Sequence, residues 1–196
     1  MTEHDASPFW FVRASSMTTD TWVGLDLPPL DDDPYHFEGA RRDQKVLEEI
    51  HRGDADALTS VDLVVTDRGR WLGDMLWAVG DRFVAVSDRV VETLRAVGAT
   101  GWETLPTTLR YKNGTEIPGY HLFVVRGVCG DFTVDLRAGR PPDLEAGWDG
   151  SDVFNWDGPW YEFCVTDRVH SAFVEAGLTR VEYERADRRV TKPPCE

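Results

Sequence analysis

Two Asp-Arg steps are the residues of this sequence whose types and spacing first suggest chemistry. Asp88-Arg89 and Asp167-Arg168 stand at matching places in a stretch that the chain writes twice. Such pairs could act as two copies of an acid beside a cation. The structural alternative is that each Asp favours the positive end of a helix dipole while each Arg lies on a solvated face. We favour the structural interpretation.

The remaining polar residues form no metal-binding or catalytic motif. The histidines have none of the HxH, HxxxH or HExxH spacings of metal ligands. Asp31, Asp32 and Asp33 are consecutive and precede a proline, whereas a calcium loop needs alternating acids and a turn glycine. There is no GxSxG elbow and no glycine-rich phosphate loop. The sequence therefore predicts no catalytic residue, no metal site and no cofactor.

An acidic, aromatic loop is the best candidate for a binding site. Residues 138–158 are dense in Pro, Gly and Asp and carry Trp148 and Trp156, with Trp160 just beyond. A loop this long inside a compact domain is usually functional or mobile. Tryptophan in a charged frame is typical of a binding hot spot. The alternative, that these rings cover the core beneath the loop, stays open.

The repeated stretch predicts the elements that position these residues. Residues 86–104 and 165–183 align without a gap and are identical at seven of nineteen positions. Each copy is expected to form a strand, a helix and a strand, because a short apolar run precedes each Asp-Arg step. Ser87 and Thr166 stand at the N-cap, where a hydroxyl group can accept a hydrogen bond from a helix N–H.

One face of each helix is predicted to be buried. Apolar side chains recur at i, i+4 and i+7, which places them on one stripe. The stripe consists of Val90, Leu94 and Val97 in the first copy and of Val169, Phe173 and Ala176 in the second. Gly98 and Gly177 are expected to end the helices in the left-handed conformation that glycine adopts without strain.

The rest of the chain shows further strand and helix patterns. They predict strands at residues 9–12, 21–25, 61–66, 120–125 and 131–136, helices at 40–52 and 70–79, and a hairpin turn at Asn113-Gly114. Residues 27–34 are expected to be an irregular loop and residues 126–130 a turn.

These elements predict an α+β fold with a mixed or antiparallel sheet and a duplicated strand-helix-strand unit. We expect one domain over residues 1–185, because the length suits a single core. Residues 1–60 would be its N-terminal part and residues 61–185 would carry the duplicated unit. Residues 186–196 are expected to be a polar tail.

Composition restricts the classes of partner. A net charge of −14 disfavours nucleic acid and acidic membrane surfaces. No apolar run reaches the length of a membrane span and the first residues do not form a secretion signal, so we expect a cytoplasmic protein. The three cysteines show no CxxC spacing, which predicts buried thiols rather than a disulfide framework or a zinc site. An acidic surface suits a basic partner, or serves solubility alone.

Several short motifs follow one another between residues 61 and 185. They are Gly73-Asp74-Met75-Leu76-Trp77, Phe83-Val84-Ala85-Val86-Ser87-Asp88-Arg89, Gly101-Trp102-Glu103, Tyr120-His121-Leu122-Phe123-Val124-Val125 and Ala176-Gly177-Leu178-Thr179. This order resembles family eleven of the immunity proteins of bacterial polymorphic toxin systems. Arg180 stands where the pattern of that family has a second glycine, and Trp102 stands where a smaller apolar residue is common. The resemblance implies a protein that binds and neutralises a cognate toxin and is not an enzyme.

Our leading hypothesis is therefore an acidic immunity-type protein whose loops at 28–34 and 139–159 bind a basic toxin surface. The residues expected to contact the toxin are Asp31, Asp32, Asp33, Trp148, Asp149, Asp152, Trp156 and Trp160. The competing hypothesis is a small enzyme or ligand-binding module with a pocket between the two strand-helix units, using His121, Asp135 or Asp167. A third possibility is a scaffold subunit whose acidity only keeps it in solution.

Overall fold

The two copies of the repeated stretch lie in different sheets. The computed structural model describes residues 7–15, 22–25, 61–65, 71–78, 84–129, 144–155 and 162–188. The first copy belongs to an eight-stranded sheet and the second to a five-stranded sheet, where one sheet was expected. Both sheets contain parallel and antiparallel neighbours, so this is a mixed α+β fold made mostly of strands. The predicted helix at 40–52 and the predicted strand at 131–136 lie outside the described residues.

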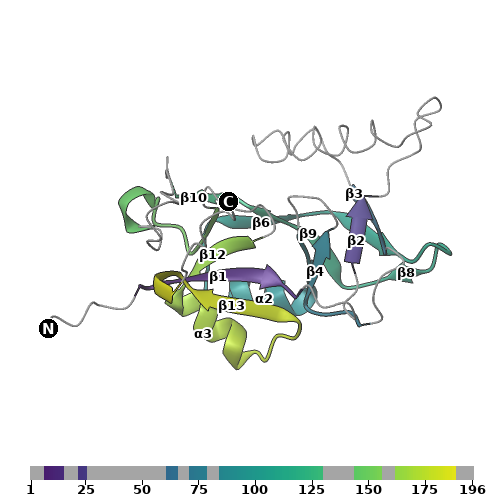
Figure 1. Cartoon of the computed structure of the whole chain (residues 1–196). Helices are drawn as coiled ribbons and strands as arrows, with labels where there is room; N and C mark the ends of the chain where they lie inside the picture. Colours follow the sequence, from purple (N-terminus) through teal and green to yellow (C-terminus); the bar gives the residue numbers. More distant parts are fainter. Residues whose placement is uncertain are drawn as a thin grey trace, which may run out of the picture.

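The five-stranded sheet places β1 (Phe9–Ala14) between the two strands of the second copy. β1 is antiparallel to both β12 (Glu162–Thr166) and β13 (Val181–Arg185). β11 (Val153–Asn155) is antiparallel to β12, and β10 (Gly127–Val128) lies parallel to β11. The order is therefore β10-β11-β12-β1-β13, with β13 at one edge (Figure 1).

The eight-stranded sheet holds the first copy in the same arrangement. β9 (Tyr120–Val125) lies between β5 (Val84–Ser87) and β6 (Trp102–Leu105) and is antiparallel to both. The sheet continues from β5 through β4 (Met75–Ala78), β2 (Trp22–Leu25), β3 (Val61–Val65), β7 (Thr107–Arg110) and β8 (Glu116–Ile117). The β7-β8 hairpin confirms the predicted turn: Tyr111 N–H donates to Thr115 O, and Gly114 has a φ of 84°.

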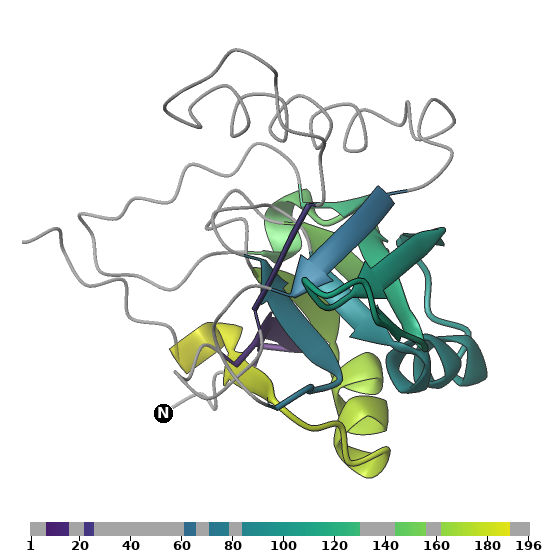
Figure 2. The same ribbon diagram turned by 90° about the vertical axis from the view of Figure 1, so that its right-hand side faces the viewer.

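Helices α2 (Asp88–Ala96) and α3 (Asp167–Glu175) each follow a strand without an intervening loop. They contact one another, and they lie side by side in two perpendicular views (Figures 1 and 2). As predicted, Gly98 and Gly177 follow the helices with a φ of 62° at both positions. Among the described residues, no helix is long and apolar enough to cross a membrane.

The buried faces of the helices differ in part from the predicted stripes. Four of the six predicted positions, Val90, Leu94, Val169 and Phe173, carry fully buried side chains, and Val91 is buried as well. Val97 and Ala176, expected to complete the stripes, are only half-buried. Each helix is short and ends before its third stripe residue, so the burial is concentrated in its first two turns.

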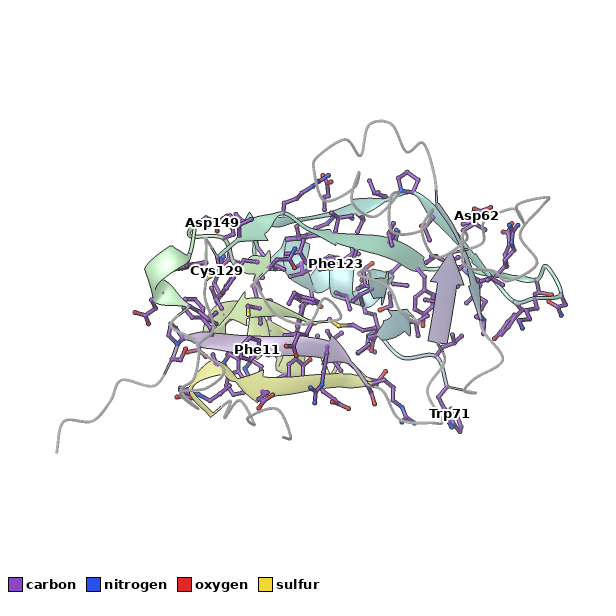
Figure 3. The ribbon with its side chains drawn as sticks, turned by 45° about the horizontal axis from the view of Figure 1, so that its top comes forward. Phe11, Asp62, Trp71, Phe123, Cys129 and Asp149 are labelled. Atoms are coloured by element: carbon purple, nitrogen blue, oxygen red, sulfur yellow. The ribbon has the colours of Figure 1, made fainter. Side chains whose placement is uncertain are left out.

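One apolar cluster fills the space between the two sheets and the two helices. Phe123 of β9 and Phe163 of β12 join the sheets, with ring centroids 5.4 Å apart (Phe123 is labelled in Figure 3). The buried members of the cluster are Val12, Ala14, Met75, Val84, Val86, Val90, Val91, Leu94, Phe123, Val153, Phe163, Val165, Val169 and Phe173. The two strand-helix units therefore share one core.

Two further clusters cover the outer faces of the sheets. On the eight-stranded sheet the buried residues are Val23, Leu63, Val65, Leu76, Ala85, Leu105, Leu109, Ile117, Leu122 and Val124. On the five-stranded sheet they are Phe9, Phe11, Cys129, Leu144, Phe154, Cys164 and Ala186, with Trp148 packed against them. Cys129 and Cys164 are thus buried, as predicted, while Cys195 lies outside the described residues.

The predicted helix at 70–79 is wrong, because Met75–Ala78 form strand β4. β4 lies between β2 and β5, and its two faces are both covered: Met75 packs in the shared core and Leu76 in the cluster on the outer face. A strand buried on both faces is a short continuous apolar run, and periodicity does not separate such a run from a short buried helix.

Three irregular segments of the prediction contain regular structure. The expected turn at 126–130 includes β10, and Cys129 forms an isolated bridge with Trp148. The expected loop at 138–158 includes the short 3₁₀-helix η2 (Glu145–Gly147) and β11. The expected tail begins with the 3₁₀-helix η3 (Ala186–Arg188). Each of these elements is too short to leave a periodic signal in the sequence.

Candidate partner-binding surface

The outer face of the five-stranded sheet brings three glutamates together around one arginine. Arg13 of β1 lies directly opposite Glu162 of β12 on one side and Glu182 of β13 on the other. Phe11, two residues earlier on the same face, lies opposite Glu184. Directly opposed residues of an antiparallel pair point to the same side of a sheet. Strand register alone therefore gathers these carboxyl groups on one face.

Arg13 bonds to one of these glutamates and lies near a second. Its Nε donates to Glu182 Oε2 at 2.8 Å, and its NH1 lies 4.0 Å from Glu162 Oε2. The side chain of Glu162 is fully buried, whereas those of Arg13 and Glu182 are each more than a third exposed. Burial opposes the charge of Arg13, but its hydrogen bond to Glu182 and the nearby carboxyl groups outweigh this effect and raise the pKa of the guanidinium. The arginine is therefore a permanent cation.

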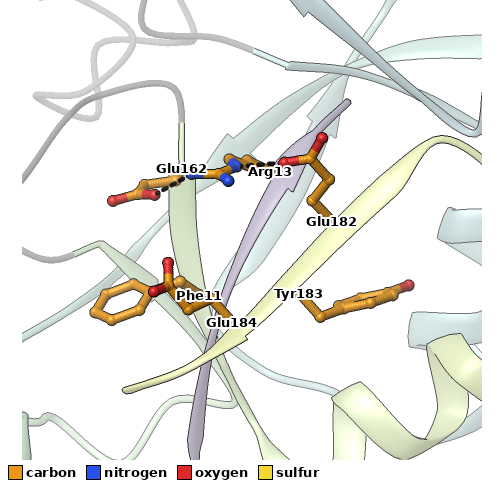
Figure 4. A pocket seen from close by; sticks show the side chains of 6 residues that line it. All are labelled: Phe11, Arg13, Glu162, Glu182, Tyr183 and Glu184. Carbon is orange, nitrogen blue, oxygen red and sulfur yellow. Dashed lines mark hydrogen bonds and ion pairs between the residues drawn. The ribbon is translucent and has the colours of Figure 1, made fainter. Parts of the chain in front are cut away.

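A small, shallow surface hollow lies over this group. Phe11, Arg13, Glu162, Glu182, Tyr183 and Glu184 line it. Figure 4 shows the carboxyl groups and Phe11 on one side of the sheet, whereas the ring of Tyr183 extends to the other side, toward α3. The carboxyl groups of Glu182 and Glu184 at this hollow favour a cationic ligand such as a lysine or arginine side chain. Among the described residues, no three His, Cys, Asp or Glu side chains gather as metal ligands.

Trp148, predicted to contact a partner, packs against the core. Its ring centroid lies 5.0 Å from that of Phe9 in an edge-to-face arrangement and 6.1 Å from that of Phe154. Its indole N–H donates to Ser151 O at 2.7 Å. The ring is half-buried and covers the outer cluster of the five-stranded sheet. These contacts match the alternative interpretation, in which the rings of this loop cover the core.

The other predicted contact residues fall into two groups. Asp149 is exposed, and its carboxylate accepts the N–H groups of Val128 and Ser151, each at 2.9 Å (Figure 3). Burial would raise the pKa of Asp149, but these backbone bonds outweigh it and hold the pKa below its usual value. Asp152 is 9% exposed and serves a structural network. Residues 31–33, 156 and 160 lie outside the described residues.

The Asp152 network joins the two strand-helix units. The Asp152 carboxylate accepts bonds from Thr166 Oγ1 at 3.1 Å, from Thr100 N–H at 3.0 Å and from Thr100 Oγ1 at 3.1 Å. Arg168 donates to it through NH2, and through NH1 to the carbonyl of Val97 at the end of α2. A cation at a helix C-terminus is favoured by the dipole of the helix. The first turn of α3 is thus bonded to the last turn of α2.

The Asp74 network forms the reciprocal junction. The Asp74 carboxylate accepts bonds from Ser87 Oγ at 2.7 Å, from Thr179 N–H at 2.7 Å and from Thr179 Oγ1 at 3.0 Å. Arg89 donates to Asp74 at 3.0 Å and to the carbonyl of Ala176 at 2.6 Å. Here the first turn of α2 is bonded to the last turn of α3.

These networks correct two predictions. Neither Ser87 nor Thr166 makes a side-chain capping bond, because each hydroxyl group is bonded to the aspartate of its network instead. Arg89 and Arg168 do not simply lie on a solvated face, since each links two helices. The arginines of both Asp-Arg steps thus have structural roles, and their acidic partners Asp74 and Asp152 lie 15 and 16 residues earlier in the sequence.

His121 and Asp167, proposed for the competing hypothesis, each have a neighbour close by. His121 Nε2 lies 2.6 Å from Asp88 Oδ1, and the indole N–H of Trp10 donates to Asp167. The ring of Trp10 also stacks on His170, with centroids 3.7 Å apart. His121 lies on β9 in the first unit and Asp167 begins α3 in the second. Apolar side chains of the shared core occupy the space between the two units. Asp135 lies outside the described residues.

The sequence interpretation missed Arg13, Glu162, Glu182 and Glu184. The sequence contained a signal for two of them. Glu182 and Glu184 are two residues apart in β13, and side chains two residues apart in a strand point to the same face. Glu162 is a charged residue at the start of an otherwise apolar strand, which also marks it as unusual. Their gathering around Arg13 depends on the pairing of β1 with distant strands, which no local pattern reveals.

An exposed tryptophan was missed as well. Trp71 is 59% exposed and is the most exposed large hydrophobic side chain among the described residues (Figure 3). Leu72 beside it is 37% exposed, and Gly73 then packs against Arg180 just before β13. Trp71 falls within the wrongly predicted helix at 70–79, so its exposure was not expected from the sequence.

Comparison with known proteins adds no assignment. No protein-family model matches the chain, and no curated protein matches it.

Proposed function

We propose that the chain is an immunity-type protein that binds and neutralises a cognate bacterial toxin without catalysing a reaction. The observation that carries the proposal is charge: the chain has 35 acidic and 21 basic side chains, a net charge of −14. On the outer face of the five-stranded sheet three glutamates and one arginine line a shallow hollow. Such a surface attracts a basic protein and speeds its association.

The resemblance to immunity-protein family eleven is part of this proposal. It rests on the order of the short motifs from Gly73 to Thr179. The proposed toxin has a basic surface, and the proposed site of action is the cytoplasm, with no cofactor and no nucleic acid involved. The loops at 28–34 and 139–159 remain proposed contact regions, of which Asp149 is an exposed and described member.

Two observations support binding over the competing hypothesis of a pocket between the strand-helix units. Packed apolar side chains occupy that space in the described part of the chain. The hollow over Arg13 lies instead on the outer face of the five-stranded sheet, and the side chains of Arg13 and Glu182 at its rim are each more than a third exposed. A protein partner uses such a shallow, charged surface more readily than a small molecule does, because small-molecule sites are concave and mostly apolar.

We also propose that the two strand-helix-strand units are duplicated copies of one ancestral unit. Each has a helix that directly follows a strand, an intervening antiparallel strand, and an aspartate network with a matching set of donors. Ser87, Arg89 and Thr179 in the Asp74 network correspond to Thr166, Arg168 and Thr100 in the Asp152 network. Two of these three pairs, Arg89/Arg168 and Thr179/Thr100, are identical positions of the repeat, and Ser87/Thr166 keeps a hydroxyl group.

The test of the proposed function is co-expression with the product of the neighbouring gene. We expect that product to be toxic alone, to be tolerated when this chain is present, and to co-purify with it. A variant with Glu182→Gln and Glu184→Gln tests the role of charge, and Glu92→Gln with Glu175→Gln removes two exposed helix carboxylates as a matched control. Toxicity that persists with the wild-type chain, without co-purification, would contradict the proposal.

A further inference from the structure

Strand β13 ends the five-stranded sheet with one edge unpaired. In the described part of the chain, β13 pairs with β1 and with no other strand. All five of its residues are half-buried. An edge strand presents a row of N–H and C=O groups to which a further strand can bond.

The direction of these backbone groups follows from one hydrogen bond. Ser15 N–H donates to Arg180 O, the residue pair that continues the β1-β13 ladder. In an antiparallel ladder the residues alternate between pairs that exchange hydrogen bonds and pairs that do not. Glu182 and Glu184 therefore turn their backbone groups toward β1. Val181, Tyr183 and Arg185 turn theirs to the open edge.

The side chains of β13 also alternate, which gives the edge a chemical preference. Glu182 and Glu184 project on the side of the hollow, and Tyr183 projects on the side of α3 (Figure 4). A strand added at this edge would place every second side chain beside one of the two glutamates, at cross-strand distance. Lysine or arginine at alternate positions satisfies both carboxylates. Residues on the other face of the added strand would meet Tyr183.

The matching edge of the other sheet lacks this pattern. β6 is the edge strand of the eight-stranded sheet and contains a single acid, Glu103, to which Arg126 bonds through two of its nitrogens. Its chain continues through Pro106, which has no N–H, into β7. β13 thus differs from β6 in carrying two carboxylates two residues apart, Glu182 opposite Arg13 and Glu184 opposite Phe11.

We propose that β13 is the docking edge of this protein, and that it pairs with an extended segment of the toxin that carries Lys or Arg at alternate positions. This inference rests on the proposed function for the identity of the partner. The backbone of Val181, Tyr183 and Arg185 supplies affinity for any strand. Glu182 and Glu184 select a basic strand and fix its register, because a shift by one residue turns the basic side chains to the wrong face.

The edge is tested directly with a labelled peptide in which lysine alternates with threonine. We expect it to bind the full chain, to shift the amide NMR signals of Val181, Tyr183 and Arg185, and to slow hydrogen exchange there. A peptide with glutamate in place of lysine, and one with the same composition but adjacent lysines, should bind at least about fivefold more weakly. Equal binding of the three peptides, or signal changes confined to other elements, would overturn the proposal.

Variants separate the edge from the general acidity of the chain. Glu182→Gln with Glu184→Gln should weaken binding of the alternating lysine peptide about fivefold, whereas Glu92→Gln with Glu175→Gln should leave it unchanged. Val181→Pro removes an N–H group that points to the open edge and does not remove a bond to β1. The variant should therefore lose binding while its circular dichroism spectrum remains that of a folded chain. If Val181→Pro unfolds the chain, the Glu182→Gln, Glu184→Gln variant decides the outcome, with circular dichroism as the check that it is folded.

The same variants distinguish a failure of this inference from a failure of the proposed function. If the wild-type chain neutralises the toxin and the Glu182→Gln, Glu184→Gln variant does so equally well, the docking edge is refuted and the proposed function stands. If the alternating lysine peptide binds at β13 but the chain neither binds nor neutralises the toxin, the proposed function fails and the docking edge is supported.

Discussion

Arg180 and Gly73 share one space at the junction between β13 and β4. A Cβ atom on Gly73 would lie 2.3 Å from Arg180 Cβ and 2.8 Å from Arg180 Cγ. Arg180 has a φ of 60°, a left-handed conformation in which a non-glycine residue is strained. At the corresponding corner of the other unit the left-handed residue is Gly101, and it packs against Ser151. Each of these two contacts, Gly73 with Arg180 and Ser151 with Gly101, forms what we call a corner and contains one glycine. In one corner this glycine is Gly73, opposite the left-handed Arg180, and in the other it is the left-handed Gly101 itself.

Exchanging the glycine within the first corner should therefore be tolerated. We expect Gly73→Ser alone to destabilise the chain by about 1 to 3 kcal/mol, because its Cβ overlaps the Arg180 side chain. Gly73→Ser with Arg180→Gly reproduces the Ser151-Gly101 corner and should recover at least about 1 kcal/mol of that loss. Urea unfolding measures both changes. Gly73→Ser combined with Arg95→Gly, which lies on an exposed turn of α2, is the control and should be additive. Additivity in the first pair would contradict the proposed correspondence of the corners.

Removing the charge of either network aspartate should loosen the junction of the two units. Asp152→Asn cannot keep all the bonds from Thr100, Thr166 and Arg168, so we expect a loss of about 2 kcal/mol in the free energy of unfolding. Asp74→Asn should cost a similar amount. Chemical denaturation measures the effect, with Glu92→Gln as an exposed control near zero. A cost no larger than that of the control variant would show that the networks do not hold the units together.

Acid should weaken the fold through Asp149 and Asp152. Burial would raise the pKa of Asp152, but bonds from Arg168, Thr100 and Thr166 outweigh it and lower the pKa below its ordinary value. A carboxylate whose pKa is lower in the folded state stabilises the fold at pH values above its unfolded pKa of about 4, and this contribution disappears as the pH falls through the folded pKa. We expect unfolding free energy to drop below about pH 4, and to drop less steeply in Asp152→Asn. Identical pH profiles for the two proteins would contradict the assignment.

His170 should titrate below the ordinary range of histidine. Burial, aided by Arg185, lowers its pKa, and the opposing effect of Asp167 is smaller. Because the folded pKa is depressed, the neutral ring stabilises the fold at pH values above about 6.5, and this contribution is lost as the pH falls through the folded pKa. The NMR signal of the His170 ring measures the midpoint directly. Trp10→Phe, which changes the ring stacked on His170, should move it. A midpoint above about 6.5 would contradict the burial of this ring.

The strand-helix-strand units could be predicted from sequence because their determinants are local. An apolar run, a capping position, an apolar stripe and a glycine stop lie within nineteen consecutive residues in each copy. The left-handed conformation of Gly98 and Gly177 is a property of single residues and was predicted correctly. β4 was assigned wrongly because its apolar run is buried between β2 and β5, and that burial is set by tertiary structure.

The candidate surface could not be predicted, because its residues come together only through long-range pairing. Arg13 meets Glu162 and Glu182 across strands that are far apart in the chain. Asp152 was expected to contact a partner because it lies in an acidic loop, yet Arg168, Thr100 and Thr166 bond to it. Local composition shows that this loop is acidic. It does not distinguish a carboxylate that bonds within the fold, such as Asp152, from one that is exposed to solvent, such as Asp149.

The measurement that tests the central claim most directly is a titration of the purified toxin with the purified chain. If the protein neutralises by binding, toxin activity should fall in proportion to the amount of chain added, reach its end point at saturation, and return when the complex is dissociated. Activity that is unaffected by a large excess of the chain would contradict the account. So would a loss that grows with time at amounts of chain far below the amount of toxin, since that is the behaviour of an enzyme.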